Sequence, residues 1–160
     1  MIIHPFPPEY DERSEVLILG SFPSVKSREQ MFFYGHPQNR FWRVTSAVFG
    51  EDTPSTIAEK KAFLHRNKIA LWDVISSCEI TGSSDSSIRN VTASDLSGIL
   101  KNSRISRIFV NGRTAEKYFN KYTKEKIGIS AVCLPSTSPA NAAWSLERLI
   151  DAWRVINSSK

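Results

Sequence analysis

Residues 31–42, MFFYGHPQNRFW, combine side chains that could hold a flat ligand with side chains that could do polar chemistry on it. Five aromatic rings share these twelve positions with a His-Pro pair, Gln38, Asn39 and Arg40. Core segments rarely carry so many polar side chains, and exposed loops rarely carry so many rings. The amide of Asn39 can accept a hydrogen bond through its carbonyl oxygen and donate through its NH₂ group. The stretch therefore predicts a site at which an amide acts among ring walls.

Four segments rich in polar or aromatic residues each follow a short apolar run. They occupy residues 20–42, 73–90, 111–115 and 134–141 (the last is LPSTSPAN). In an α/β protein with a parallel sheet, ligands bind where loops leave the carboxyl ends of the strands. Because all four segments are expected at such ends, we predict that they meet at one cleft.

The elements that must position these loops alternate along the chain. Apolar runs predict strands at 15–20, 69–75, 107–112 and 130–135, and helical spacing of apolar residues predicts the helices between them. The predicted helices cover 41–50, about 53–65 (opened by Thr53-Pro54), a short segment capped by Ser94 or Asp95, 113–122 and 145–156. Residues 76–95 are rich in Ser, Thr and Asp and are predicted to form a long loop. Strands alternating with helices indicate an α/β fold with a mainly parallel sheet, and residues 1–160 are expected to form a single domain.

Composition narrows the class of protein. The chain carries 21 Lys and Arg against 16 Asp and Glu, which gives a net charge of +5 and a pI near 9.4. A polyanionic partner is consistent with this balance, although the charge does not establish one. No apolar run approaches the roughly 18 residues of a membrane span, and the N-terminus lacks the pattern of a signal peptide. We therefore expect a cytoplasmic protein, nucleoid-associated in a prokaryote, with no membrane contact.

Several chemistries lack their motifs. The glycines do not form the phosphate-binding patterns of nucleotide enzymes, and no GxSxG follows a predicted strand. The three histidines have no metal-like spacing, and two cysteines, Cys78 and Cys133, are too few and too far apart for a cysteine-based zinc site. We expect neither a metal nor a cofactor, and we expect His36 to order its loop by hydrogen bonding.

The sequences GSFPS at 20–24, GHPQNRFW at 35–42 and LPSTSPAN at 134–141 together resemble the uracil-DNA glycosylase superfamily. The first loop is similar to that of the mismatch-specific members, and LPSTSPAN is similar to the turn that enters the DNA duplex. The resemblance covers roughly the whole chain. It implies a single-domain three-layer α/β/α sandwich with a four-stranded, mainly parallel sheet in the order 2-1-3-4. It also implies a monomeric DNA glycosylase of base excision repair, which rotates a damaged base out of the DNA helix. Double-stranded DNA is the expected substrate, and single-stranded DNA is a second candidate.

Three departures from the uracil-specific pattern indicate a branch. Phe22 stands where most members carry the residue that handles water, Leu134 replaces a histidine that stabilises the leaving uracil, and Asp73 replaces a base-recognising Asn. This combination resembles the hypoxanthine-DNA glycosylase branch, in which the asparagine of the PQNRFW block is catalytic. The resemblance assigns that role to Asn39. Its carbonyl oxygen could hold the attacking water while its NH₂ group binds the base or a backbone acceptor.

The remaining site residues form two groups. Tyr34 matches the base-stacking aromatic of the superfamily, and Asp73 is expected either to contact the base edge or sugar or to cap a loop. The predicted base pocket consists of Ser21, Phe22, Pro23, Tyr34 and Asp73. Small side chains of the second motif could fill the space of the flipped base, and Ser138-Pro139 resembles a helix start suited to a phosphate. The predicted DNA contacts are Ser136, Thr137, Ser138, Asn141 and Arg40.

Two other functions are consistent with these residues. The first loop is also similar to glycosylases that remove uracil or mismatched thymine, and a non-catalytic DNA-binding module could have lost the water-handling residue. The superfamily's strand order implies, in addition, that the strands of Cys78 and Cys133 are not neighbours, so both thiols are expected to be free.

Overall fold

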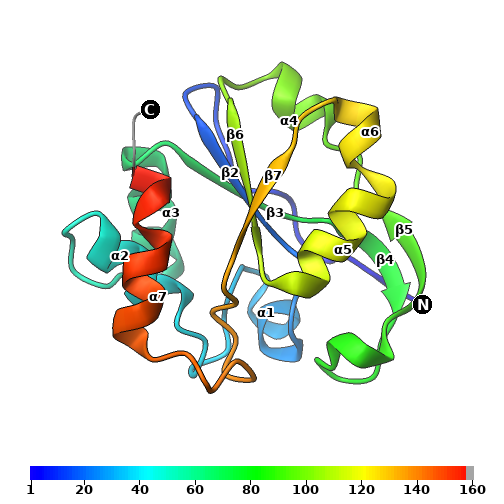
Figure 1. Cartoon of the computed structure of the whole chain (residues 1–160), viewed down its shortest axis with the longest axis horizontal. Helices are drawn as coiled ribbons and strands as arrows, with labels where there is room; N and C mark the ends of the chain where they lie inside the picture. Colours follow the sequence, from blue (N-terminus) through cyan, green and yellow to red (C-terminus); the bar gives the residue numbers. More distant parts are fainter. Residues whose placement is uncertain (158–160) are drawn as a thin grey trace.

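A computed structural model of the chain, which describes residues 1–157, has a four-stranded parallel sheet at its centre (Figure 1). The strands lie in the order β3 (Ile69–Asp73), β2 (Val16–Gly20), β6 (Arg107–Asn111), β7 (Ala131–Leu134). In chain order of the four predicted strands this is 2-1-3-4, so the predicted order is confirmed. Gly20 pairs with Asp73 in register, which brings the ends of two strands to one edge of the sheet.

Helices cover both faces of this sheet and complete three layers (Figure 1). One face carries α2 (Phe41–Val48), α3 (Ile57–Arg66) and α7 (Leu146–Trp153), the last continued by a 3₁₀ turn at Arg154–Asn157. The other carries α4 (Ser97–Lys101), α5 (Arg113–Tyr122) and the short α6 (Lys124–Ile127). Among residues 1–157, no helix has the length and apolar character needed to cross a bilayer.

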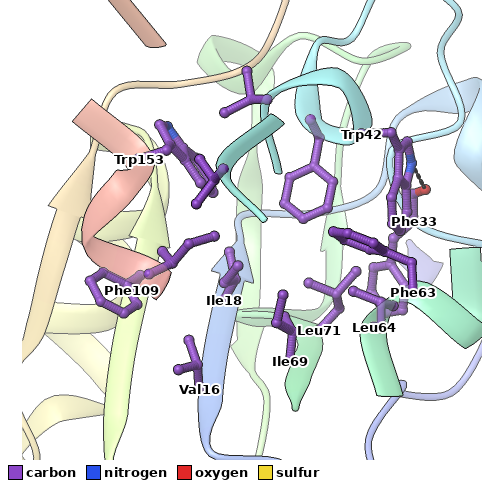
Figure 2. Packing of buried hydrophobic residues seen from close by; sticks show 14 of the residues in the cluster. Val16, Ile18, Phe33, Trp42, Phe63, Leu64, Ile69, Leu71, Phe109 and Trp153 are labelled. Atoms are coloured by element: carbon purple, nitrogen blue, oxygen red, sulfur yellow. Dashed lines mark hydrogen bonds between the residues drawn. The ribbon is translucent and has the colours of Figure 1, made fainter. Parts of the chain in front are cut away.

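The alternation of side chains along β2 explains why both faces must be covered. All of Val16–Gly20 is buried. Val16 and Ile18 point into one hydrophobic cluster, seen in Figure 2 with Trp153 and Phe63, whereas Leu17 and Leu19 point into a second cluster on the opposite face. A strand buried on both faces appears in a sequence as a continuous apolar run, which is why EVLILG was a reliable strand prediction.

The predicted long loop at 76–95 is wrong, because this segment contains two strands. β4 (Ile75–Glu79) and β5 (Arg89–Ala93) pair antiparallel, and β1 (Ile2–Ile3) joins β4 to make a second, three-stranded sheet in the order β1-β4-β5. A 3₁₀ turn at Asp85–Ser87 connects β4 to β5. The Ser- and Thr-rich composition hides these strands, since their pairing depends on the distant N-terminus and on irregular register.

Helix boundaries also differ from prediction, and a helix α1 (Val25–Gln30) was not predicted. α3 begins after Thr56 rather than at Thr53-Pro54, because Thr56 and Glu59 form a capping box. α4 begins after Leu96, and Asp95 assists by accepting a hydrogen bond from the Ser97 amide at 2.9 Å.

The predicted helix start at Ser138-Pro139 is wrong. These residues form a turn, and α7 begins later, at Leu146, where the Ser145 side chain accepts a hydrogen bond from the Arg148 amide. Residues 135–145 between β7 and α7 therefore form an extended loop at the carboxyl edge of the sheet (Figure 1).

Both cysteines are free, as predicted: Cys78 is buried on β4 and Cys133 is half-buried on β7, in the other sheet. Burial raises the pKa of each thiol. We expect mass spectrometry to find no disulfide, and Ellman's reagent to react slowly with Cys133 and with Cys78 only after unfolding. Rapid modification of Cys78 in the native protein, compared with a urea-unfolded control, would contradict the placement of β4.

Candidate active site

A cavity of about 530 Å³ opens at the carboxyl ends of the parallel strands. Its volume lies within the range of about 300–1,000 Å³ that is usual for small-molecule sites. Its walls come from the ends of β2, β3 and β6, from the loop that precedes α2, from the turn between β4 and β5, and from the loop after β7. The predicted residues that line it are Ser21, Phe22, Pro23, Tyr34, Asn39, Asp73, Ser136, Thr137 and Ser138. The tertiary structure thus brings segments separated by more than a hundred positions to one site.

Two hydrogen bonds fix the orientation of the Asn39 amide. Its Oδ1 accepts from the backbone N–H of Phe41 and from the hydroxyl of Thr137, each at 2.9 Å. Of the two polar atoms of an Asn side chain, only the oxygen can accept from a backbone N–H, so Nδ2 is the atom left to face the cavity that Asn39 lines. The carbonyl oxygen is therefore already occupied, and the prediction that it holds the attacking water is wrong. What Asn39 offers to a ligand is its NH₂ group.

Thr137 is the residue that holds Asn39 in place. It is fully buried, and its hydroxyl also accepts from Asn111 Nδ2 at 3.0 Å. Its backbone N–H donates to Asn111 Oδ1 at 3.1 Å, and its carbonyl accepts from the Arg40 amide at 3.0 Å. The side chain of Thr137, which the sequence predicts to contact DNA, is enclosed in this network at the wall of the cavity. Asn111 was not singled out in the sequence, although its place at a strand end was a usable signal.

Arg40 organises the same loop from the other side. Its guanidinium donates to the carbonyl oxygens of Ser138, Asn141 and Trp144. Three of its five N–H donors are used in this way, so Arg40 holds the loop in shape. Its contact with a DNA phosphate stays a prediction. Asn141 is likewise turned inward, since its Nδ2 donates to the carbonyl of Ser136 at 3.0 Å.

Small residues form the exposed tip of this loop. Ser136 and Ser138 close turns through their hydroxyls, which accept from the Ser138 and Ala140 amides at 3.1 Å. Within residues 139–143 the exposed side chains are Pro139, Ala140, Ala142 and Ala143. The loop therefore presents a small apolar tip on a rigid polar frame.

The end of the cavity at strand β3 carries a buried carboxylate. Asp73 is 4% exposed, and its Oδ2 lies 2.7 Å from Nε2 of His4. The sequence left open whether Asp73 contacts a ligand or caps a loop; here it lines the cavity and pairs with a histidine from the N-terminal segment. The sequence predicts no role for His4. No pattern in the sequence links positions 4 and 73, because the contact depends on the pairing of β1 with β4.

Aromatic rings form the apolar wall. Tyr34 stacks on Phe41 with ring centroids 4.0 Å apart and an interplanar angle of 12°. Phe22 and Phe33 line the cavity beside it. Burial, reinforced by the charge of Asp73, raises the pKa of Tyr34 well above its ordinary value, so its hydroxyl keeps its proton.

The mouth of the cavity holds a second carboxylate that sequence reasoning missed. Ser21 Oγ donates to Asp85 Oδ1 at 3.3 Å, which ties the turn between β4 and β5 to the first loop. Desolvation by the surrounding protein raises the pKa of the Asp85 carboxyl above its ordinary value. On the opposite side, His36 orders its loop as predicted, because its Nδ1 accepts from the Gln38 amide at 3.1 Å.

The cavity lies at the carboxyl ends of parallel strands and has aromatic walls, a buried carboxylate and an inward-facing amide. These features are those of an α/β protein that encloses a flat ligand with a polar edge. Residues 7–157 match the family model of the uracil DNA glycosylase superfamily. The chain belongs to this superfamily, which confirms the resemblance carried by GSFPS, GHPQNRFW and LPSTSPAN.

Relatives and a solved structure agree with this assignment. The chain is 38% identical over 150 residues to a protein of Methanosarcina acetivorans named hypoxanthine DNA glycosylase, covering 92% of this chain and 94% of the relative. It is 36% identical over 139 residues to a protein of the same name from Methanosarcina barkeri, covering 85% and 86%. A solution NMR structure from M. acetivorans, provisionally named a uracil DNA glycosylase, matches with a TM-score of 0.81 and 34% identity over 99% of this chain and 100% of the other.

We expect Thr137→Val to destabilise the protein by about 1–3 kcal/mol, because it removes the acceptor of Asn111 Nδ2 and a donor to Asn39 Oδ1 from a buried position. The free energy of unfolding in urea measures this cost. Thr137→Ser keeps the hydroxyl and serves as the matched control, with a smaller loss. Equal stability of the Val variant and the wild type would contradict the network.

Proposed function

We propose that this protein is a DNA glycosylase that removes hypoxanthine from DNA by hydrolysing the bond between the base and C1′ of deoxyribose. Membership of the superfamily and the names of two relatives support this function. The single structural observation that supports it best is the amide of Asn39, locked with its NH₂ group toward a cavity with aromatic walls.

The arrangement suits a base that has been rotated out of the duplex. Aromatic walls stack on any base, each contact contributing about 1–3 kcal/mol. The exposed tip of residues 139–143 is small and apolar, which suits a segment that fills the gap left in the duplex. The positive net charge of +5 favours binding to the phosphate backbone.

The chemistry requires charge stabilisation at two places. As the C1′–N bond lengthens, the sugar becomes cationic and the base becomes anionic. A preorganised NH₂ donor stabilises an acceptor atom of the departing purine, so we assign this role to Asn39. The buried carboxylate of Asp73 supplies a negative field in the pocket and an acceptor for a base N–H. Water then attacks C1′ as the purine leaves with the electron pair of the broken bond, and the proton that the water loses passes to the purine anion.

The proposal extends to the setting of the reaction. Hypoxanthine arises by deamination of adenine in duplex DNA, so we take double-stranded DNA as the substrate, single-stranded DNA as an alternative, and a monomer as the active form. Two free cysteines suit a reducing compartment such as the cytoplasm.

We expect duplexes containing one deoxyinosine to be cleaved faster than matched duplexes containing uracil, xanthine or a G:T mismatch. The reason is the departure at the first turn, where Phe22 replaces the water-handling residue of uracil-specific members. Alkaline cleavage of labelled oligonucleotides measures the excision rates. Uracil excision as fast as that of hypoxanthine would instead favour the uracil-removing alternative.

Asn39→Ala should lower the single-turnover excision rate by about 10²–10³-fold, the usual cost of removing one preorganised donor at a reaction centre. Asn39→Asp should fail as well, since its carboxylate keeps the acceptor for Phe41 but replaces the NH₂ group with an anionic oxygen. Gln38→Ala is the control, because Gln38 is an exposed neighbour that does not line the cavity. Strong activity of Asn39→Asp would contradict this role and indicate that the side chain at position 39 holds the attacking water.

A further inference from the structure

The N-terminal segment places a histidine, His4, behind Asp73, one of the residues that line the cavity. β1 pairs antiparallel with β4, and the His4 amide then donates to the Ser76 carbonyl at 2.8 Å. The ring of His4 packs against Trp72 with centroids 4.2 Å apart and edge-on against Phe6 at 4.6 Å. The side chains of His4 and Asp73 are only 3% and 6% exposed. This pair is therefore held rigidly, and no step of the mechanism above requires the histidine.

The hydrogen bonds of His4 determine what Asp73 presents to the cavity. Nδ1 of His4 is buried and has no partner among the described residues, so the ring proton belongs on Nε2, where Asp73 Oδ2 accepts it at 2.7 Å. Oδ1 of Asp73 receives no hydrogen bond from residues 1–157 and belongs to a residue that lines the cavity. The histidine thus fixes one oxygen of the carboxylate and leaves the other as an acceptor.

A donor lies beside that acceptor. A Cβ placed on Gly20 would come within 2.5 Å of Asp73 Oδ1 and 3.1 Å of the Tyr34 hydroxyl, so both atoms border the space above this glycine. The Tyr34 hydroxyl is buried, and no residue in the described part of the chain accepts a hydrogen bond from it; the Asn111 side chain lies close to its oxygen. The wall of the pocket therefore holds an acceptor without a protein partner, Asp73 Oδ1, beside a hydroxyl that still has a proton to donate.

This order of acceptor and donor is complementary to a lactam base. Hypoxanthine presents a donor, N1–H, beside an acceptor, O6, whereas adenine presents an acceptor, N1, beside a donor, its amino group. A flipped base is recognised by hydrogen bonds along this edge. Adenine would set its N1 lone pair against an anionic oxygen and leave buried polar atoms unpaired, which is the most effective way to reject a close analogue.

We propose that His4 is a positioning residue for base specificity: by fixing Oδ2 of Asp73, it presents Oδ1 to accept N1–H of hypoxanthine and to exclude adenine. This inference rests on the proposed function for the identity of the base. It explains how an enzyme of this kind spares the adenine that is abundant in its own substrate. It also gives the N-terminal strand a role in selectivity, although this strand lies outside the sequence motifs.

The test measures binding without requiring catalysis. Duplexes carry 2′-fluoroarabino hypoxanthine or adenine, because the fluorine destabilises positive charge at C1′ and prevents cleavage, and the base stands opposite an abasic-site analogue, so neither base is paired. We expect the wild-type protein to prefer hypoxanthine by at least about tenfold in Kd, and His4→Ala to reduce this preference to about threefold or less. His4→Gln, whose amide can still donate to Oδ2, should recover most of it.

Asp73→Asn gives a sharper outcome. With His4 present, the amide carbonyl turns toward Nε2–H and the NH₂ group faces the cavity, where it repels N1–H and suits N1 of adenine. The preference should therefore shift toward adenine. In the double variant H4A/D73N, the amide can rotate, and the discrimination between the two bases should be small.

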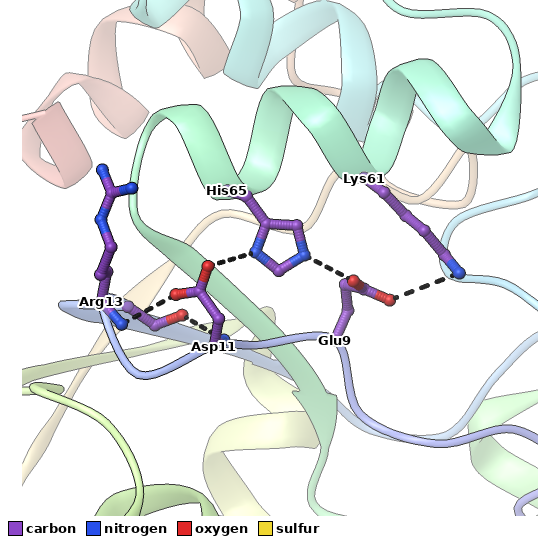
Figure 3. Close-up of polar contacts among 6 residues, drawn as sticks. Glu9, Asp11, Arg13, Lys61 and His65 are labelled. Carbon is purple, nitrogen blue, oxygen red and sulfur yellow. Dashed lines mark hydrogen bonds and ion pairs between the residues drawn. The ribbon is translucent and has the colours of Figure 1, made fainter.

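A second histidine–carboxylate pair provides the matched control. His65 on α3 lies 2.7 Å from Glu9 and 3.0 Å from Asp11, outside the cavity (Figure 3). His65→Ala should lower stability without changing the preference between bases.

The possible results are distinct. An unchanged preference in folded His4→Ala, or in Asp73→Asn if the alanine variant does not fold, would overturn the inference and leave His4 a packing residue. Failure of the wild type to cleave ordinary deoxyinosine, together with a retained binding preference, would overturn the proposed function instead.

Discussion

The hydrogen bond from the Thr137 hydroxyl to the Asn39 carbonyl joins the two loops on which the site depends. One loop precedes α2 and the other follows β7, and neither has regular structure that would fix its shape. Because Thr137 is fully buried, each of its polar atoms needs a partner, and Asn39, Asn111 and the Arg40 amide satisfy them together. The requirement to satisfy these buried groups sets the geometry of the site and determines which end of the Asn39 amide meets the ligand.

A second constraint acts at the inner end of the cavity. A carboxylate that is 4% exposed is costly to keep unless it is paired, and His4 supplies that partner for Asp73. The close approach of Asp73 to Gly20 leaves no room for a side chain at that position. Phe22, which replaces a polar residue of other members, packs edge-on toward the His4 ring at 5.8 Å. Two of the three departures from the uracil-specific pattern, Phe22 and Asp73, thus meet at the His4 ring. The third, Leu134, lies on β7 at the opposite edge of the parallel sheet.

Much of the fold followed from local patterns. The four parallel strands appear as apolar runs because both faces of the sheet are covered, and α5 and α7 appear through helical spacing. β4 and β5 were missed because these short strands carry few apolar residues and β4 also pairs with the distant β1. The six-residue helix α1 was missed because it buries only Ser27 and so shows no apolar spacing. The helix start at Ser138-Pro139 was mistaken because a serine-proline turn and a helix N-terminus share one local pattern, and only the Arg40 contacts decide between them.

The sequence by itself determined the family and the strand order, through the resemblance, and the four segments that line the cavity, because loops at the carboxyl ends of parallel strands converge. Tertiary structure alone decided the directions and partners of those side chains. It turned the Asn39 carbonyl away from the ligand, buried Thr137 and brought His4 to Asp73. The physical reason is that hydrogen bonds between side chains depend on ångström-scale placement of distant segments, whereas residue type and spacing constrain only which segments form and in what order they pack.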